Sequence, residues 1–276
     1  MREANAIMKA GVYAREPIRT IGGIPVFSEP DKYIENYEKV SHDHLKVMKK
    51  EGSNPWIEED LWVEMEDSTA QLVEKYCEPG RPVLDVGVGL GRLLSRFPNL
   101  QRYGMDISLE YLEIARSKGV EVCFARVEDM PFRADQFDLV LSTDILEHVT
   151  DLNLSLTRML HVLKPGGVLI ARVPYREDLS PYLESDYPYE FAHLRNFDEY
   201  SLRLLFERIF DCEWIESKTT GHYLQGNSRL KYRIPKGERT LIRMLNRMHT
   251  SFPRMHKRLL PKFVLPIEIN VVVRKK

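Results

Sequence analysis

The chain has 276 residues, of which 43% are hydrophobic and 29% charged, and its 40 Lys and Arg nearly balance 41 Asp and Glu. This composition excludes a disordered chain, and no apolar run approaches the ~20 residues that a membrane-spanning helix needs. The three cysteines, Cys77, Cys123 and Cys212, are isolated, so we expect reduced thiols and neither a disulfide framework nor a zinc site. The first residues lack the apolar stretch of a secretory signal, and we therefore expect a cytoplasmic protein.

Residues 1–78 are expected to form an N-terminal extension made of helices. The segments 31–50 and 57–77 both have helical character, and the second carries apolar residues near helical spacing. Pro79 and Gly80 then interrupt the chain before the first predicted strand. We expect this extension to cap the domain that follows.

From residue 79 onward, strands and helices alternate, which indicates a parallel sheet with crossover helices. The expected strands are 82–86, 101–105, 121–125, 137–142, 167–173, 211–218 and 267–273. The expected helices are 90–97, 108–118, 151–163 and 198–209. Pro266 should mark the beginning of the last strand, because proline cannot donate a hydrogen bond within a central ladder.

The first strand is followed by the most informative motif, in which Asp85 precedes glycines at alternate positions, Gly87, Gly89 and Gly91. A strand, a glycine turn and a helix N-terminus together form a cradle for a nucleotide-type ligand. A dinucleotide fingerprint would need its third glycine where the chain has Arg92, so a nicotinamide dehydrogenase is disfavoured. The run D-x-G-x-G-x-G resembles the first motif of class I S-adenosylmethionine-dependent methyltransferases.

Three later segments resemble the same family. Residues 124–132 are similar to its D-A-E-D-L-P-F stretch, 137–149 to F-D-x-V-x-x-x-x-x-L-E-H-V, and 160–167 to R-V-L-K-P-G-G. With these matches in order, the chain resembles the ubiquinone-biosynthesis-like (type 11) methyltransferases over residues 80–175. The resemblance implies S-adenosylmethionine as cofactor. It also implies a methyltransferase domain over 79–276 with a Rossmann-like seven-stranded mixed sheet of order 3-2-1-4-5-7-6, flanked by helices, and an insertion between strands 6 and 7.

The resemblance also implies the cofactor contacts. Asp85 would lie beneath the loop of residues 86–91, and the backbone of this loop would pass against the methionine part of the cofactor. Asp106, at the end of the second strand, would accept the ribose hydroxyl protons, and its alternative use as a helix N-cap is disfavoured because Ser108 can supply the cap. The adenine segment has Arg126 where the family has an acid, which leaves the backbone of Val127 and the side chain of Glu128 as contacts. The predicted cofactor-binding residues are Asp85, Gly87, Gly89, Gly91, Asp106, Ile107, Val127, Glu128 and Ser142.

Titratable side chains gather after the fourth strand, where the family places the transferred methyl group. The spacing of Asp144, Glu147 and His148 predicts one face of a helical turn, and His193 follows later in the chain. We predict His148, His193 and Asp144 as the catalytic residues, with a neutral imidazole as general base. The pattern is also similar to the E-x-x-E-H of metal-dependent O-methyltransferases, so a divalent metal is an alternative that we rank below a histidine base. A purely structural role for either histidine stays open.

Two segments are expected beside the acceptor. The connection 174–189 carries clustered tyrosines, which suit a sugar or phenol ring, although packing on a loop would also explain them. The insertion 220–262 is basic, with eleven Lys and Arg against one acid between residues 229 and 262. An amphipathic helix over 238–249 would pack on the core, rest on an anionic membrane surface, or bind an anionic substrate such as a phosphate, a nucleotide sugar or RNA. RNA is disfavoured, because no RNA-binding module is recognisable and the rest of the chain is acidic.

Together these patterns predict a methyltransferase that uses S-adenosylmethionine on a hydroxyl of a small-molecule, glycan or lipid-linked acceptor. The protein would be cytoplasmic, with peripheral membrane contact through 229–262 as one option. The alternatives are an RNA or protein methyltransferase that uses the basic segment, and a non-catalytic scaffold that binds the cofactor.

Overall fold

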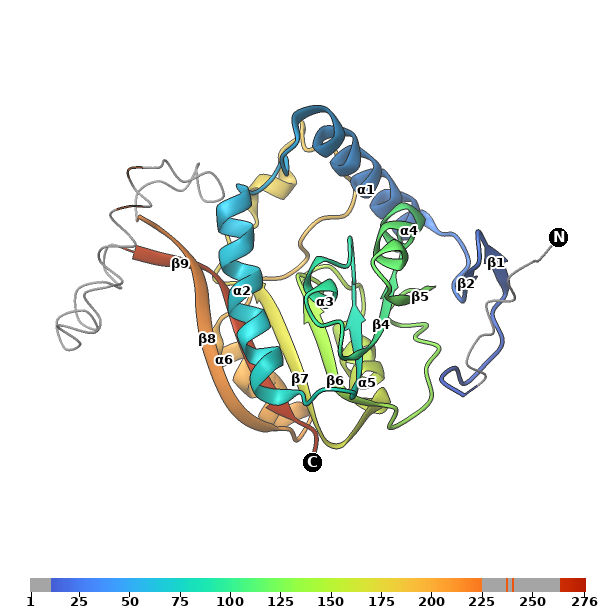
Figure 1. Ribbon diagram of the computed structural model, residues 1–276. Coiled ribbons are helices and arrows are strands. Elements are labelled where there is room, and N and C mark those ends of the chain that lie inside the picture. The colour runs from blue at the N-terminus through green and yellow to red at the C-terminus, as the bar shows by residue number, and fades with distance from the viewer. Residues whose placement is uncertain (1–10, 225–236, 238–239, 241–263) are drawn as a thin grey trace.

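A nine-stranded sheet runs through the computed structural model, which describes residues 11–224, 237, 240 and 264–276. Helices cover both faces of this sheet (Figure 1). The strands lie in the order β1-β2-β5-β4-β3-β6-β7-β9-β8. They are β1 (Arg19–Ile21), β2 (Ile24–Val26), β3 (Pro82–Val86), β4 (Gln101–Asp106), β5 (Glu121–Phe124), β6 (Phe137–Thr143), β7 (Leu163–Pro174), β8 (Glu213–Leu224) and β9 (Val264–Arg274).

The seven strands from β3 to β9 confirm the strand order that the resemblance implies. In the sheet they read β5-β4-β3-β6-β7-β9-β8, and β9 is antiparallel to both of its neighbours. The position expected for Pro266 is wrong, because β9 begins at Val264 and Pro266 lies inside the strand, opposite His222. Pairing between β9 and β7 ends at Glu268, so Pro266 has β8 as its strand neighbour, and a residue without an N–H is tolerated there.

The two remaining strands belong to the part of the N-terminal extension that precedes the predicted helices, where no strand was expected. β1 and β2 form a hairpin through Gly22 and Gly23, whose φ values are 57° and 82°. Positive φ at both positions suits a two-residue hairpin turn that matches the right-handed twist of the strands. β2 pairs in parallel with β5, and the N–H of Phe27 donates to the carbonyl of Phe124 at 2.8 Å. The hairpin therefore extends the sheet at the edge opposite β8 (Figure 1).

The helices divide the core between the two faces of the sheet. They are α1 (Lys32–Glu51), α2 (Glu59–Tyr76), α3 (Arg92–Ser95), α4 (Leu109–Ser117), α5 (Leu152–Val162), the 3-10 turn η1 (Ser180–Leu183), α6 (Glu199–Leu204) and the π-helical turn η2 (Leu205–Ile209). One core cluster joins the sheet to α5, α6 and η2, and the other joins it to α1, α2, α3 and α4. Neighbouring residues of β3 alternate between the two, with Val83 in one cluster and Leu84 in the other.

Three expectations about segment bounds are corrected. The helix expected over 90–97 is limited to α3. Its N-cap, Gly91, has a left-handed backbone conformation, and Pro98 disfavours helical geometry in the residue that precedes it. The helix expected over 198–209 changes to π-helical geometry at Leu205. β8 continues to Leu224, so the strand covers the first residues of the expected insertion, and the helix expected over 238–249 lies almost wholly outside the described residues.

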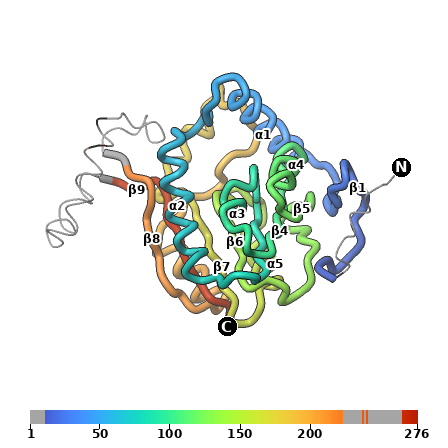
Figure 2. Tube along the Cα trace, in the orientation of Figure 1, coloured from blue at the N-terminus to red at the C-terminus, as the bar shows by residue number. Residues whose placement is uncertain are grey.

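In Figures 1 and 2, α1 lies along the upper rim of the molecule, and α2 runs down the face of the sheet beside β8. The side chain of Asp31 caps the N-terminus of α1 by accepting from the N–H of Ile34 at 2.8 Å. α2 packs against β7, β8 and β9, and α1 packs against α4. In the part of the chain that the structure describes, no helix is both long and apolar enough to span a membrane.

Candidate active site

A cavity of about 1220 Å³ lies between the carboxyl ends of the parallel strands, helices α1 and α2, and the segment 174–193. Nine of the predicted site residues line it, namely Gly87, Gly89, Asp106, Ile107, Val127, Glu128, Asp144, His148 and His193. The predicted cofactor and catalytic groups therefore share one space. This is the crevice where ligands bind in open α/β sheets.

Three predicted cofactor residues do not line the cavity. Asp85 is buried in β3 beneath the glycine loop, and burial together with the Asp106 carboxylate raises its pKa to about 8. Gly91 is the N-cap of α3, where an added Cβ would lie 2.9 Å from the Cβ of Ala115. Ser142 is completely buried within β6. These residues shape the cradle from below, without facing the space in which a ligand would lie.

The glycine loop has the geometry of a cradle for a ligand that contacts backbone. Gly87 and Gly89 have φ values of 77° and 49°. A Cβ added to Gly87 would lie 1.9 Å from Cδ1 of Ile145, whereas a Cβ added to Gly89 would meet no atom within 4 Å. The space beside Gly89 belongs to the cavity and suits the methionine part of S-adenosylmethionine.

Asp106 has the position required to bind ribose hydroxyls. Its Oδ1 accepts from the N–H groups of Ile107 and Ser108, and its Oδ2 accepts from the N–H of Gly89 at 2.9 Å. A carboxylate offers about four acceptor positions, so these three bonds leave capacity on Oδ2. Ser108 caps α4 through its hydroxyl, as predicted, with Oγ accepting from the N–H of Tyr111. The donors and acceptors present thus fit a nucleoside with a ribose.

Arg126, which stands where the family has an acid in the predicted adenine segment, is held by partners within the protein. The Arg126 guanidinium pairs with Asp31, the cap of α1, and its Nη2 donates to Thr150 at 2.9 Å. Its Nε also lies 3.5 Å from Glu128, whose other oxygen accepts from Thr150 at 3.0 Å. Arg126 thus ties the cap helix to this segment, and the carboxylate of Glu128 is already engaged within the protein. The backbone of Val127 is the better candidate for reading the adenine edge.

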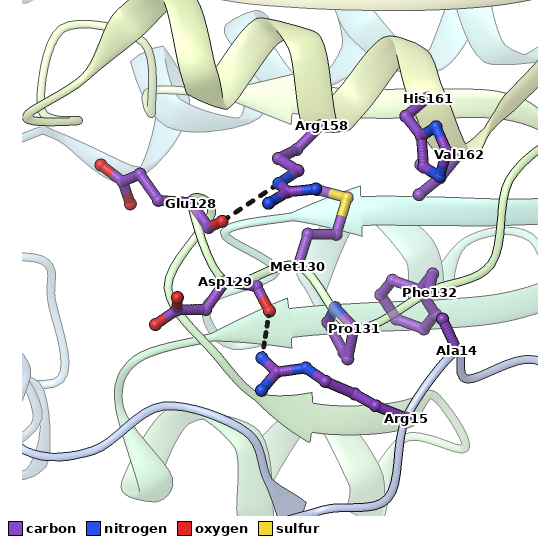
Figure 3. A pocket seen from close by; sticks show the side chains of 10 residues that line it. All are labelled: Ala14, Arg15, Glu128, Asp129, Met130, Pro131, Phe132, Arg158, His161 and Val162. Atoms are coloured by element: carbon purple, nitrogen blue, oxygen red, sulfur yellow. Dashed lines mark hydrogen bonds between the residues drawn. The ribbon is translucent and has the colours of Figure 1, made fainter.

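Two further arginines hold this segment from opposite sides, as Figure 3 shows. Arg15, from the N-terminal extension, donates to the carbonyl of Asp129 at 2.7 Å, and Arg158, from α5, donates to the carbonyl of Glu128 at 3.2 Å. They line a second, smaller groove of about 410 Å³ on the outer side of the segment. Their contacts fix the backbone next to the predicted adenine position.

Asp144 lies in a different local geometry from the one predicted. It has a φ of 57°, so the segment after β6 is a turn and does not place Asp144 on a helical face with Glu147 and His148. Its Oδ2 lies 2.6 Å from Nη2 of Arg172, and its N–H donates to the carbonyl of Arg172 at 2.9 Å. This ion pair engages one carboxylate oxygen, and the catalytic role of Asp144 stays a prediction.

Arg172 is the centre of a buried network that the sequence analysis missed. It is 3% exposed, its Nε lies 2.6 Å from Glu268 of β9, and its Nη1 donates to Thr69 of α2 at 3.2 Å. The Thr69 hydroxyl donates in turn to Asn270 at 2.8 Å. The network links the cap, two strands and the turn of Asp144. A lone arginine within the apolar run of β7 was the signal available in the sequence.

Glu147 and His148 lie together at the base of the cavity. Glu147 is fully buried, and among the described residues neither of its carboxyl oxygens has a hydrogen-bond partner. Burial, with the Asp144 carboxylate nearby, raises the pKa of Glu147 well above its usual range. His148 Nδ1 shares a hydrogen bond of 2.8 Å with the hydroxyl of Tyr37, and burial lowers the pKa of His148 to about 3. His148 is therefore a neutral imidazole at physiological pH.

His193 is held differently, by a carboxylate. Its Nδ1 contacts Oε2 of the buried Glu177, and the Tyr182 hydroxyl donates to Oε1 of Glu177 at 3.0 Å. The Tyr182 hydroxyl also lies 3.2 Å from Nδ1 of His193. This arrangement fixes the ring and leaves Nε2 as the nitrogen able to take a proton. No pattern in the sequence pointed to Glu177.

The same residues could hold a cation. One ligand atom each from Glu147, His148 and His193 lies within 4.8 Å of the others. A carboxylate and two imidazoles suit several divalent transition metals. Asp144, the fourth residue of the metal alternative, is directed to Arg172 instead.

Comparison with known proteins agrees with this geometry. The methyltransferase domain family matches residues 84–171. The chain carries a methyltransferase domain. The cradle described above fits S-adenosylmethionine, the cofactor that the resemblance implies.

Two relatives and one solved structure illustrate the likeness. An uncharacterized protein of Methanocaldococcus jannaschii is 31% identical over 147 residues, which are 53% of this chain and 62% of that protein. A ubiquinone biosynthesis O-methyltransferase of Nitrobacter winogradskyi is 35% identical over 103 residues, or 34% of this chain and 39% of that enzyme. The match therefore spans less than two thirds of either relative. A possible histamine N-methyltransferase from Thermotoga maritima shares the fold, with a TM-score of 0.56, 20% identity, and coverage of 88% of this chain and 100% of that one.

Proposed function

We propose that the chain transfers a methyl group from S-adenosylmethionine to a hydroxyl of a small-molecule, glycan or lipid-linked acceptor. One observation carries the proposal: the glycine cradle, Asp106 and the Glu177–His193 pair all belong to one cavity. The cofactor and a proton acceptor would then meet in the same enclosed space.

When bound, S-adenosylmethionine supplies an electrophilic methyl carbon and leaves as S-adenosylhomocysteine. The chain contributes positioning and proton transfer. The backbone at Gly89 and the carboxylate of Asp106 hold the nucleoside end, while α1 and the segment 174–193 limit the access of water. His193 Nε2 would take the proton of the acceptor hydroxyl as the oxygen attacks, and Glu177 would stabilise the imidazolium that forms.

Substitution of His193 by Gln tests this assignment. We expect kcat to fall by about 100-fold or more, the range of general base catalysis, with the affinity for S-adenosylhomocysteine unchanged in calorimetry. The control is His42→Gln, an exposed histidine on α1 outside the cavity, which should have no effect on either quantity. Methyl transfer is followed with radiolabelled donor across panels of phenols, sugars, lipid-linked glycans, RNA and proteins. Activity on RNA or protein alone would refute the proposed acceptor class, and cofactor binding without turnover on any acceptor would favour a scaffold.

A metal-assisted transfer is the second candidate, and the buried Glu147 favours it. A buried carboxylate that lacks a hydrogen-bond partner among the described residues is stabilised either by a proton or by a cation. If a cation fills this place, activity after EDTA treatment should return with Mn²⁺ or another divalent transition metal, and Glu147→Gln should abolish that response. Full activity in EDTA would leave the histidine base as the remaining mechanism.

A further inference from the structure

The acceptor side of the cavity has a continuous aromatic wall. Its members come from α1, the turn after β6 and the segment 180–193, and each ring lies 4.5 to 5.8 Å from the next, measured between centroids. In order they are Phe191, Tyr33, Tyr37, His148, His193, Tyr182, Tyr187 and Tyr189. Such a wall suits a flat ring, which would lie against the faces or edges of these side chains.

The charge of the cavity is strongly one-sided. Among its described lining residues, eight are acids and two are arginines. The acids are Asp106, Glu128, Asp144, Glu147, Glu177, Asp178, Glu184 and Glu268. Both lining arginines already face carboxylates, Arg126 that of Asp31 and Arg176 that of Asp198, the latter at 3.3 Å. A phosphate or carboxylate brought into this space would find few cations to receive it.

Internal pairing cancels only part of this charge. The buried Arg172 offsets Asp144 and Glu268, Arg126 lies 3.5 Å from Glu128, and His193 faces Glu177. Glu184 lies at the exposed end of the cavity, in the same segment as the tyrosines of the wall. A protonated amine placed there would meet a carboxylate and ring faces, and the two attractions add. Lys39 shows that this region accepts an ammonium, since its Nζ lies 5.3 Å from the centroid of the Tyr189 ring.

Resting on the proposed function, we propose that the acceptor is a ring-bearing hydroxyl compound with a protonated amine and without phosphate or carboxylate groups. Its ring lies along the aromatic wall, its hydroxyl points to His193, and its ammonium lies between Glu184 and the ring of Tyr187. The inference disfavours nucleotide sugars, phospholipids and RNA as acceptors at this site.

Three phenols of similar shape and different charge test the inference. Tyramine carries +1, 4-ethylphenol is neutral and 3-(4-hydroxyphenyl)propionate carries −1, while ring and hydroxyl stay the same. Calorimetry on the full chain should give an affinity for tyramine at least tenfold above that for the propionate, with 4-ethylphenol between them. Glu184→Gln should reduce the advantage of tyramine at least threefold and leave 4-ethylphenol unchanged. Glu190→Gln, an exposed acid of the same segment that does not line the cavity, should change neither.

The titrations are run with and without S-adenosylhomocysteine. Failure of that compound to bind would overturn the proposed function, whereas the order of the three phenols decides the acceptor class by itself. Equal or tighter binding of the propionate would overturn the inference, and so would the absence of binding by all three at millimolar concentration. An advantage of tyramine that persists in Glu184→Gln would overturn the placement of the ammonium.

Discussion

Substitution of Gly89 by Ala offers a direct test of the cofactor cradle. Gly89 has a φ of 49°, and its missing Cβ would point into space that no atom occupies within 4 Å. The new methyl group therefore meets no protein atom, and its effect on the folded chain is limited to left-handed backbone strain. That strain costs about 1–2 kcal/mol for a residue with a Cβ. For a chain of this size, the midpoint of thermal unfolding should fall by about 2–8 °C.

The effect on cofactor binding should be separate and larger. If the methionine part of S-adenosylmethionine lies against Gly89, the added methyl group overfills a packed contact, which costs about 1–3 kcal/mol. This corresponds to about a 5- to 150-fold loss of affinity for S-adenosylhomocysteine, measured by calorimetry at a temperature where both proteins are folded.

Gly166→Ala is a matched control for the strain. Gly166 has a φ of 75°, an added Cβ would also meet no atom within 4 Å, and the residue lies outside the cavity. It should show a similar thermal shift and normal cofactor affinity. A folded Gly89→Ala protein that binds S-adenosylhomocysteine as tightly as the unaltered chain would refute the cradle.

Three other substitutions test the surroundings of the cavity. Arg172→Met removes the cation that faces the buried carboxylate of Glu268 and the partly exposed one of Asp144. It should lower the free energy of unfolding by about 3–5 kcal/mol in urea titrations, and a loss below about 1 kcal/mol would contradict the network. Because the pKa of Asp85 is raised to about 8 from an unfolded value near 4, the folded chain holds a proton that the unfolded chain releases. Its stabilising contribution should therefore decline as pH rises from about 4 to 8, and Asp85→Asn should remove this part of the pH dependence of unfolding, whereas an unchanged slope would count against the raised pKa. Replacing Arg15 and Arg158 together by Ala should raise the KM for S-adenosylmethionine several-fold with little change in kcat. An unchanged KM would show that the two arginines in Figure 3 do not position the predicted adenine segment.

The glycine motif and the cap at Ser108 were within reach of the sequence, because each depends on local spacing, whereas the order of the seven strands followed from the resemblance to a known family. Asp85 and Gly87 are close in the chain, so a short motif is enough to predict a strand followed by a tight turn. Ser108 precedes an apolar helix, and a hydroxyl at that position caps the helix whatever packs around it.

Tertiary structure decided which charges meet. Arg172, Asp144 and Glu268 lie on three different segments, and their pairing follows from the antiparallel placement of β9 beside β7. Glu177 holds His193 from sixteen positions away, at a spacing that no local pattern specifies. A local pattern determines the conformation of the backbone near it, but the partner of a buried charge depends on which distant segment removes water from it. For this reason the chain predicts where its cofactor lies, while only the folded arrangement gives the acceptor side its aromatic wall and its negative charge.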